Sequence, residues 1–238
     1  MEKANFTDHI SRKFNTELEN LRNNVLSMGG MVEGQLQRAI DALTEGDSEL
    51  GLAVAHDDYK VNHMEVSIDE ECSRILALRS PAASDLRLIV AIIKTITDLE
   101  RMGDEAEKIG FLASRLASQQ RPSNHYREIK HLSKLVLQML RRALDSFARL
   151  DAEMAIEVVK EDAQVDEEYE SIQRQSITFM MEDPRAIRRV MDVMWTARAL
   201  ERIGDHAQNI CEHVVYMVLG KDVRHTELQH IVQEMEKK

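Results

Sequence analysis

The chain has 238 residues, a formal net charge of −11, 43% apolar residues and only 4% aromatic residues. With 9 Gly and 3 Pro it lacks the many turn residues that all-β folds need, and its composition favours helices. The strong negative charge disfavours binding to nucleic acid and to anionic lipid, so we expect no nucleic-acid partner.

No segment resembles a membrane span or a secretion signal. The longest apolar run, from Leu88 to Ile93, is far too short to cross a bilayer, and residues 1–10 contain no apolar signal core. We therefore expect a cytoplasmic protein without direct membrane insertion. Cys72 and Cys211 form no CxxC motif, which predicts reduced, packed thiols rather than a disulfide or a zinc site.

The first two helices are marked by an apolar stripe and by capping residues. Apolar residues at helical spacing predict a helix over residues 8–45. Gly29-Gly30 interrupts this stripe and predicts either a kink or a close contact with another helix. Gly46-Asp47 supplies a C-terminal glycine and an N-cap, so a second helix is expected from about 48 to 79.

Ser80-Pro81 predicts a cap followed by proline at the first position of a third helix, which runs to about Ser118. Residues 119–124 read as a linker. The succession of three predicted helices then repeats.

The second half contains three further predicted helices. A fourth helix is expected over about 125–149, and Asp151 caps a fifth. Asp183-Pro184 repeats the cap-proline pattern of Ser80-Pro81 and is expected to begin a sixth helix. Gly220 is expected to end that helix. Residues 223–238 would add a short terminal helix.

The two halves are related by an internal duplication. At an offset of 104, nine residues between 36 and 62 have identical partners, where chance predicts roughly two. They are Leu36, Arg38, Ala39, Asp41, Asp47, Glu49, Val54, Asp58 and Val61. The third and sixth helices share LER-x-GD-x-A-x-x-I at an offset of 101. The sequence predicts an all-α, elongated fold of two tandem three-helix bundles, six long helices in all, divided as residues 1–120 and 121–238.

Both repeats place acidic residues four apart on one line of a helix. Glu100 and Asp104 form this line in the first repeat, and Glu201, Asp205 and Asn209 form it in the second. Stacked carboxylates repel each other unless a positive charge neutralises them. A glycine directly precedes the aspartate of each line. A solvated acidic face remains the simplest alternative interpretation.

Antiparallel pairing around the predicted turns brings a second acidic line to each of these. Asp58 and Asn62 are expected opposite the first line, and Asp162 and Asp166 opposite the second. Oxygen donors from two helices suit Mg²⁺, Mn²⁺, Ca²⁺ or iron, and such a cluster accommodates more than one cation. His206 points away from this line and is expected at the surface.

The doubled motif resembles the signature of the PhoU family of phosphate-signalling regulators. It is carried by DLERMGDEAEKI (98–109) and ALERIGDHAQNI (199–210), with support from MGGMVEGQLQRAIDAL (28–43), DYKVNHMEVSIDEE (58–71) and SDLRLIVAIIKTITDLERMGD (84–104). The resemblance covers essentially the whole chain, including its duplication and helix order.

This resemblance implies two three-helix bundles, each holding a surface metal cluster of iron, zinc, nickel, manganese or magnesium. It implies a non-enzymatic cytoplasmic adaptor between the ATPase of the phosphate ABC transporter and the sensor histidine kinase of the phosphate regulon. Such a protein prevents kinase activation and restrains uptake when phosphate is plentiful, and the family suggests a homodimer. Lys108 stands where the second repeat has Asn209, so a weaker first cluster is expected.

Two other functions remain open from the residues. A di-iron carboxylate enzyme would need paired E-x-x-H motifs, which occur as Glu128–His131 and Glu227–His230 but not level with the acidic lines. A metal-free interaction scaffold would leave both acidic faces solvated. No P-loop, GxSxG or HExxH motif supports catalysis.

Overall fold

The computed structural model describes residues 12–119 and 126–220, and across those residues it contains helices and turns but no strand. In chain order the elements are α1 (Arg12–Glu45), α2 (Ser48–Asp57), α3 (Tyr59–Arg79), α4 (Ala83–Ala117), α5 (Arg127–Arg149), α6 (Ala152–Glu182), the short 3₁₀ helix η1 (Pro184–Ala186) and α7 (Ile187–Leu219). The predicted all-α fold of two three-helix repeats is confirmed, while the terminal helix expected at 223–238 lies outside the described residues.

The second predicted helix is interrupted at Asp58, which separates α2 from α3. The backbone of Asp58 stays near helical values, with φ −58° and ψ −33°. Its carbonyl accepts a 2.9 Å hydrogen bond from the N–H of Val61, three residues on, in addition to a longer bond from Asn62. This local tightening divides one helix into two segments in line.

Most predicted helix ends are confirmed. The side chains of Asp47 and Asp151 each accept a hydrogen bond from a backbone N–H three residues on, at 2.9 and 3.0 Å. Gly46 and Gly220 adopt positive φ values of 73° and 72°, where a residue with a Cβ atom is strained.

The predicted role of Pro81 was wrong. Ser80 adopts a left-handed conformation with φ 46° and ψ 60° at the end of α3, and α4 begins only at Ala83. The left-handed residue extends the turn, so Pro81 lies in the connection instead of the first helical turn. In the second repeat Pro184 does begin a helix, because Asp183 accepts a 3.0 Å hydrogen bond from the N–H of Arg185.

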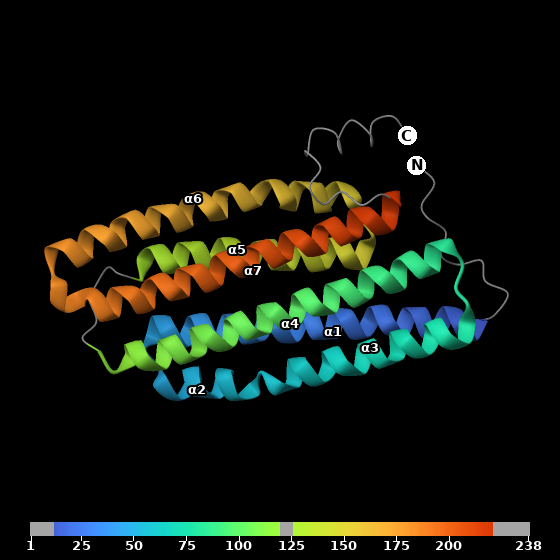
Figure 1. Ribbon diagram of the computed structural model, residues 1–238, viewed down its shortest axis with the longest axis horizontal. Coiled ribbons are helices and arrows are strands. Elements are labelled where there is room, and N and C mark those ends of the chain that lie inside the picture. The colour runs from blue at the N-terminus through green and yellow to red at the C-terminus, as the bar shows by residue number, and fades with distance from the viewer. Residues whose placement is uncertain (1–11, 120–125, 221–238) are drawn as a thin grey trace.

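The two repeats lie side by side in an elongated bundle (Figure 1). The helices α1, α4, α5 and α7 form its interior, while α2 and α3 cover one edge and α6 covers the opposite edge. Among all pairs of elements, α4 and α7 make the most extensive contact, and they run antiparallel. With 33 residues, α7 is about 50 Å long. No helix within the two described ranges combines the length and apolar character that a bilayer crossing requires.

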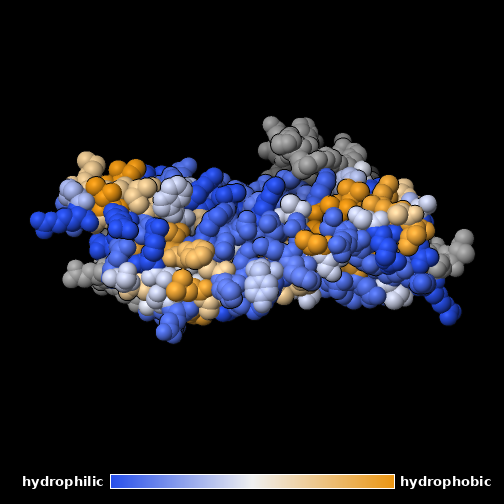
Figure 2. All heavy atoms as spheres, turned by 60° about the horizontal axis from the view of Figure 1, so that its bottom comes forward, coloured by the Kyte–Doolittle hydropathy of each residue, from blue (hydrophilic) through white to orange (hydrophobic). Residues whose placement is uncertain are grey.

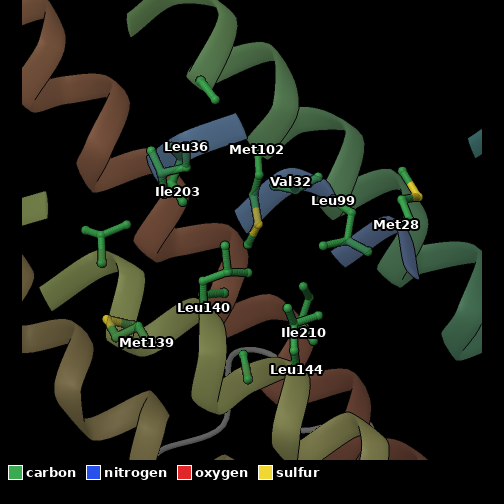
Figure 3. Packing of buried hydrophobic residues seen from close by; sticks show 14 of the residues in the cluster. Met28, Val32, Leu36, Leu99, Met102, Met139, Leu140, Leu144, Ile203 and Ile210 are labelled. Atoms are coloured by element: carbon green, nitrogen blue, oxygen red, sulfur yellow. The ribbon is translucent and has the colours of Figure 1, made fainter. Parts of the chain in front are cut away.

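One hydrophobic core joins both repeats. Figure 3 shows side chains of α1, α4, α5 and α7 meeting between the repeats, among them Met28, Met102 and Leu140, which are fully buried. Gly29 provides the predicted close contact, because a Cβ atom there would clash with a methyl carbon of Leu144 on α5. The helix α1 continues through this position without a break.

The cysteine prediction is also confirmed. Cys72 and Cys211 are both free and buried. Burial raises the pKa of each thiol to about 12, so neither forms a reactive thiolate at neutral pH.

Candidate metal centres

The first repeat gathers three carboxylates at the contact between α3 and α4. Oxygen atoms of Asp58, Asp104 and Glu107 all lie within 4.8 Å of one another, and we call these three residues the first cluster. A Cβ atom on Gly103 would lie only 3.0 Å from Asp58 Oδ1, so this glycine allows the acidic side chains to approach. The spacing of these oxygens suits a single hard cation.

Two amides complete the surroundings of Asp58. Gln35 Nε2 on α1 and Asn62 Nδ2 each donate a 3.0 Å hydrogen bond to one of its carboxylate oxygens. The remaining oxygens of these amides, Gln35 Oε1 and Asn62 Oδ1, are shielded from solvent and have no hydrogen-bond partner. Amide oxygens are good ligands for hard cations, so the unpaired oxygens strengthen the case for a cation here.

Glu100 stands apart from the three carboxylates of the first cluster. Burial raises its pKa, and the charges of Asp104, Glu65 and Asp58 raise it further. Burial and the charge of Asp58 likewise raise the pKa values of Asp104 and Glu107, although Lys108 opposes both shifts. A cation would relieve this repulsion.

The second repeat brings together Asp162, Asp166, Glu201 and Asp205, which we call the second cluster. Burial raises the pKa of Asp162 to about 7, and repulsion from Asp166 and Asp205 adds to the shift. Asp162 Oδ1 and Glu201 Oε2 are shielded from solvent without a partner, whereas the other oxygen of Glu201 bonds to the guanidinium of Arg198. Within the described ranges, these acids do not form a trio as tight as the first cluster.

The donor sets of both clusters fit a divalent cation. The pKa of Asp162 is raised because its ionisation places another negative charge beside three carboxylates in a buried setting. A cation held by Asp162, Glu201 and Asp205 would compensate these charges and satisfy the unpaired oxygens. Gly204 assists this convergence, because a Cβ atom there would lie 3.5 Å from Asp162 Oδ1.

The expectation that His206 lies at the surface was wrong. It is buried between α4 and α7, where its Nδ1 lies 2.9 Å from Asp98 Oδ1. His213 Nε2 lies 2.9 Å from Asp98 Oδ2, and Asn209 Nδ2 donates a 3.1 Å hydrogen bond to Oδ1. We call these four residues the interface cluster, because Asp98 belongs to the first repeat and the other three to the second.

The interface cluster also determines where Asn209 points. The side-chain N–H of this predicted ligand is directed at Asp98 in the other repeat, not at the carboxylates of the second cluster. Burial by itself would raise the pKa of Asp98, but hydrogen bonds from His206, His213 and Asn209 outweigh it and lower the pKa to about 2. Asp98 therefore remains charged while buried.

Lys108 does not enter the first cluster. Its Nζ lies 3.0 Å from Glu105 Oε1, and Arg202 of the other repeat pairs with the same oxygen at 2.6 Å. The lysine charge is thus partly neutralised away from Asp58 and Asp104. The charge of Lys108 still acts on the cluster from a distance, because it lowers the pKa values of Asp104 and Glu107 against the opposing effect of burial. A weaker affinity of the first cluster for metal stays a prediction.

Sequence reasoning missed Glu107 and Gln35. Glu107 lies three residues after Asp104 and seven after Glu100, which is the spacing of one helix face. Gln35 follows Val25, Met28 and Val32 on the buried side of α1, so a polar residue within an apolar stripe was the available signal.

The other candidate motifs lie elsewhere. Glu128 is in the first turn of α5, a helix that carries no member of either cluster, and Glu227–His230 lies outside the described residues. The adjacent arginines Arg141 and Arg142 pair with Glu33 and Glu157 at 2.6 and 2.7 Å, so their charges are partly neutralised.

The comparisons with known proteins agree with this architecture. Residues 25–113 and 129–214 each match the family model described as the PhoU domain. The chain is 50% identical over 234 residues to the phosphate-specific transport system accessory protein PhoU homolog of Pseudomonas aeruginosa, covering 98% of this chain and 97% of the relative. It is 49% identical over 225 residues to the corresponding Escherichia coli protein, covering 94% and 93%.

Solved structures show the same relationship. The crystal structure of PhoU from Pseudomonas aeruginosa matches with a TM-score of 0.85 at 50% identity, covering 87% of this chain and 100% of that one. The phosphate transport system regulatory protein PhoU from Streptococcus pneumoniae matches with a TM-score of 0.82 at 31% identity, covering 88% and 99%. The matched regions include both acidic clusters and the helices that carry them, so the chain belongs to the PhoU family.

Proposed function

We propose that this protein is a cytoplasmic, non-enzymatic adaptor that represses the phosphate regulon and restrains phosphate uptake. The observation that carries the proposal is the match of both repeats, over nearly the full chain, to relatives named as phosphate-specific transport accessory proteins. Its partners would be the sensor histidine kinase of the phosphate regulon and the ATPase of the phosphate ABC transporter. A second copy of the chain would form a homodimer with it.

The geometry suits an adaptor because its acidic clusters lie on opposite edges of one bundle. The first cluster is between α3 and α4, and the second is between α6 and α7. A cation such as Fe, Zn, Ni, Mn or Mg would reduce the negative charge of either edge when bound. Asp58 and Asp104 would hold such a cation in the first cluster, and Asp162 and Asp205 would hold one in the second. The surface charge of each edge would then depend on metal occupancy.

A strain that lacks its own homologous gene provides the test of the adaptor function. Expression of this chain should restore repression of a phosphate-regulon reporter in phosphate-rich medium, and the kinase and the ATPase should co-purify with it. Normal accumulation of the protein without repression and without either partner would contradict the proposal.

The metal proposal predicts the composition of purified protein. Untagged wild-type protein should contain metal by mass spectrometry, and Glu201→Ala/Asp205→Ala should lose the portion held by the second cluster while retaining the rest. The control Glu19→Ala/Glu49→Ala removes two exposed carboxylates of the first repeat and should leave the content unchanged. Metal-free wild-type protein after reconstitution would leave a scaffold with solvated acidic faces.

A further inference from the structure

An open groove of about 450 Å³ lies between α2, α3 and α4, beside the first cluster. Leu52, Tyr59 and Phe111 line it together with Asp58 and Glu107. We call it the α2–α4 groove. Its apolar wall therefore continues directly into the carboxylates of the first cluster.

The apolar wall is unusually exposed for the side chains that form it. The exposed fractions of Leu52, Tyr59 and Phe111 are 50%, 59% and 49%. Figure 2, which brings α2 and α3 toward the viewer, shows apolar side chains gathered on this face next to a hydrophilic middle. A cluster of exposed apolar side chains in a hollow is typical of a binding surface.

The second repeat shows that the fold does not require this wall. At the offsets of the duplication, Leu52 corresponds to Ile156, which is buried, and Phe111 corresponds to Glu212. Tyr59 corresponds to Ala163. The exposed wall is thus a property of the first repeat alone.

The carboxylates at the base of the groove lack a cation. Within residues 12–119 and 126–220, no ion pair involves any member of the first cluster. The nearby cations are engaged elsewhere, because Lys60 and Arg38 pair with Asp57 at 2.5 and 2.9 Å. Lys108 pairs with Glu105 at 3.0 Å. Lys108 acts on Asp104 and Glu107 only from a distance, so the groove offers carboxylates that no direct ion pair neutralises next to an apolar wall.

A buried amide oxygen provides an independent sign of a missing donor. Gln35 is 5% exposed, and its Nε2 is committed to Asp58, which leaves Oε1 without a partner beside the first cluster. A buried acceptor without a donor costs about 1–3 kcal/mol, so a ligand that supplies one is favoured. Asn62, which lines the groove, also has an unpaired amide oxygen, Oδ1. A guanidinium carries five N–H donors, enough for two carboxylates and this amide oxygen.

We infer that the α2–α4 groove binds a segment of a partner protein in which an arginine or lysine adjoins an apolar side chain. The cationic group enters between Asp58 and Glu107, and the apolar side chain lies against Leu52 and Phe111. The same carboxylates serve a metal ion and this cation, so the two compete. This inference rests on the proposed adaptor function and names the chemistry of one partner contact.

The probe is the peptide acetyl-Arg-Leu-amide. Its binding to the isotope-labelled full-length protein, without added metal, is monitored by two-dimensional NMR. The peptide should shift the amide signals of residues 52–62 and 107–111. Acetyl-citrulline-Leu-amide has nearly the same shape without the charge, and acetyl-Arg-Gly-amide lacks the apolar side chain. Each should bind at least about fivefold more weakly, and Mg²⁺ should displace the arginine peptide.

Variants locate the binding. Glu107→Gln and Phe111→Ala should each weaken the arginine peptide by about fivefold or more, whereas Asp166→Asn in the second cluster should not. The inference would be overturned if the citrulline peptide bound equally well, or if the peptide shifted only signals of the second cluster. It would also be overturned if Mg²⁺ shifted the signals and none of the peptides did. The reporter and co-purification tests are independent of this assay, so failure of the adaptor function is distinguishable from failure of the groove.

Discussion

Replacement of Asp98 by alanine should lower the free energy of unfolding by about 3–5 kcal/mol, the cost of removing one partner from a buried charged network. The carboxylate of Asp98 is the shared partner of His206, Asn209 and His213 across the contact between α4 and α7. Without it, three polar side chains would be left unpaired in the centre of the bundle. Urea denaturation at pH 7 measures the loss.

Two further variants separate the interface from a general effect of charge. Asp98→Asn keeps the shape of the side chain and should cost less than alanine. Asp69→Ala removes an exposed carboxylate of α3 and should change the unfolding free energy by less than about 0.5 kcal/mol. A loss of under about 1 kcal/mol for Asp98→Ala would show that the interface cluster contributes little to the joining of the repeats.

The same carboxylate makes stability depend on acidic pH. Its pKa is about 2 in the folded protein against a usual value of 3.8, so the unfolded chain binds the proton more readily. The contribution of Asp98 is fully present above pH 4 and is lost as the pH falls through about 2. A shift of this size corresponds to about 2 kcal/mol. Wild type should therefore lose more stability than Asp98→Asn over this interval.

The sequence predicted the helices and the acidic lines well because both depend on local spacing. Glu100 and Asp104 are four residues apart in any helix, and antiparallel pairing of the two predicted helices is enough to place Asp58 near Asp104. The turn at Ser80 was misjudged, because a left-handed residue before a proline changes where the next helix begins. The residues around Ser80 do not by themselves determine at which residue the next helix begins.

The contact between repeats could not be predicted in the same way. The location of His206 depends on how α7 is rotated against α4, and a single amphipathic pattern does not determine that rotation when both sides of a helix are covered. Asp98 differs from its duplicate Ala199, so the internal repeat gave no indication of a buried charge there. The packing of four interior helices decides both positions.

Substitution of Gly110 by alanine should destabilise the protein by about 2–3 kcal/mol, although alanine favours helices. The helices α2 and α4 touch through their backbones here, because a Cβ atom on Gly110 would lie 2.6 Å from the carbonyl oxygen of Gly51. A carbonyl oxygen of a helix cannot rotate away as a side chain can. The two helices must therefore separate, and packing around Val54, which would lie 3.3 Å from the new carbon, is lost.

Gly34→Ala is the matched control, since Gly34 also lies within a helix but has nothing within 4 Å of a Cβ atom. This variant should gain about 0.5–1 kcal/mol from helix propensity alone, so the two alanines should change urea unfolding in opposite directions. A gain for both would mean that α2 moves without cost. The residues after these glycines, Leu52 and Phe111, wall the α2–α4 groove. Separation of the helices at Gly51 and Gly110 should therefore also widen the groove and weaken the arginine peptide, which links this backbone contact to the proposed partner surface.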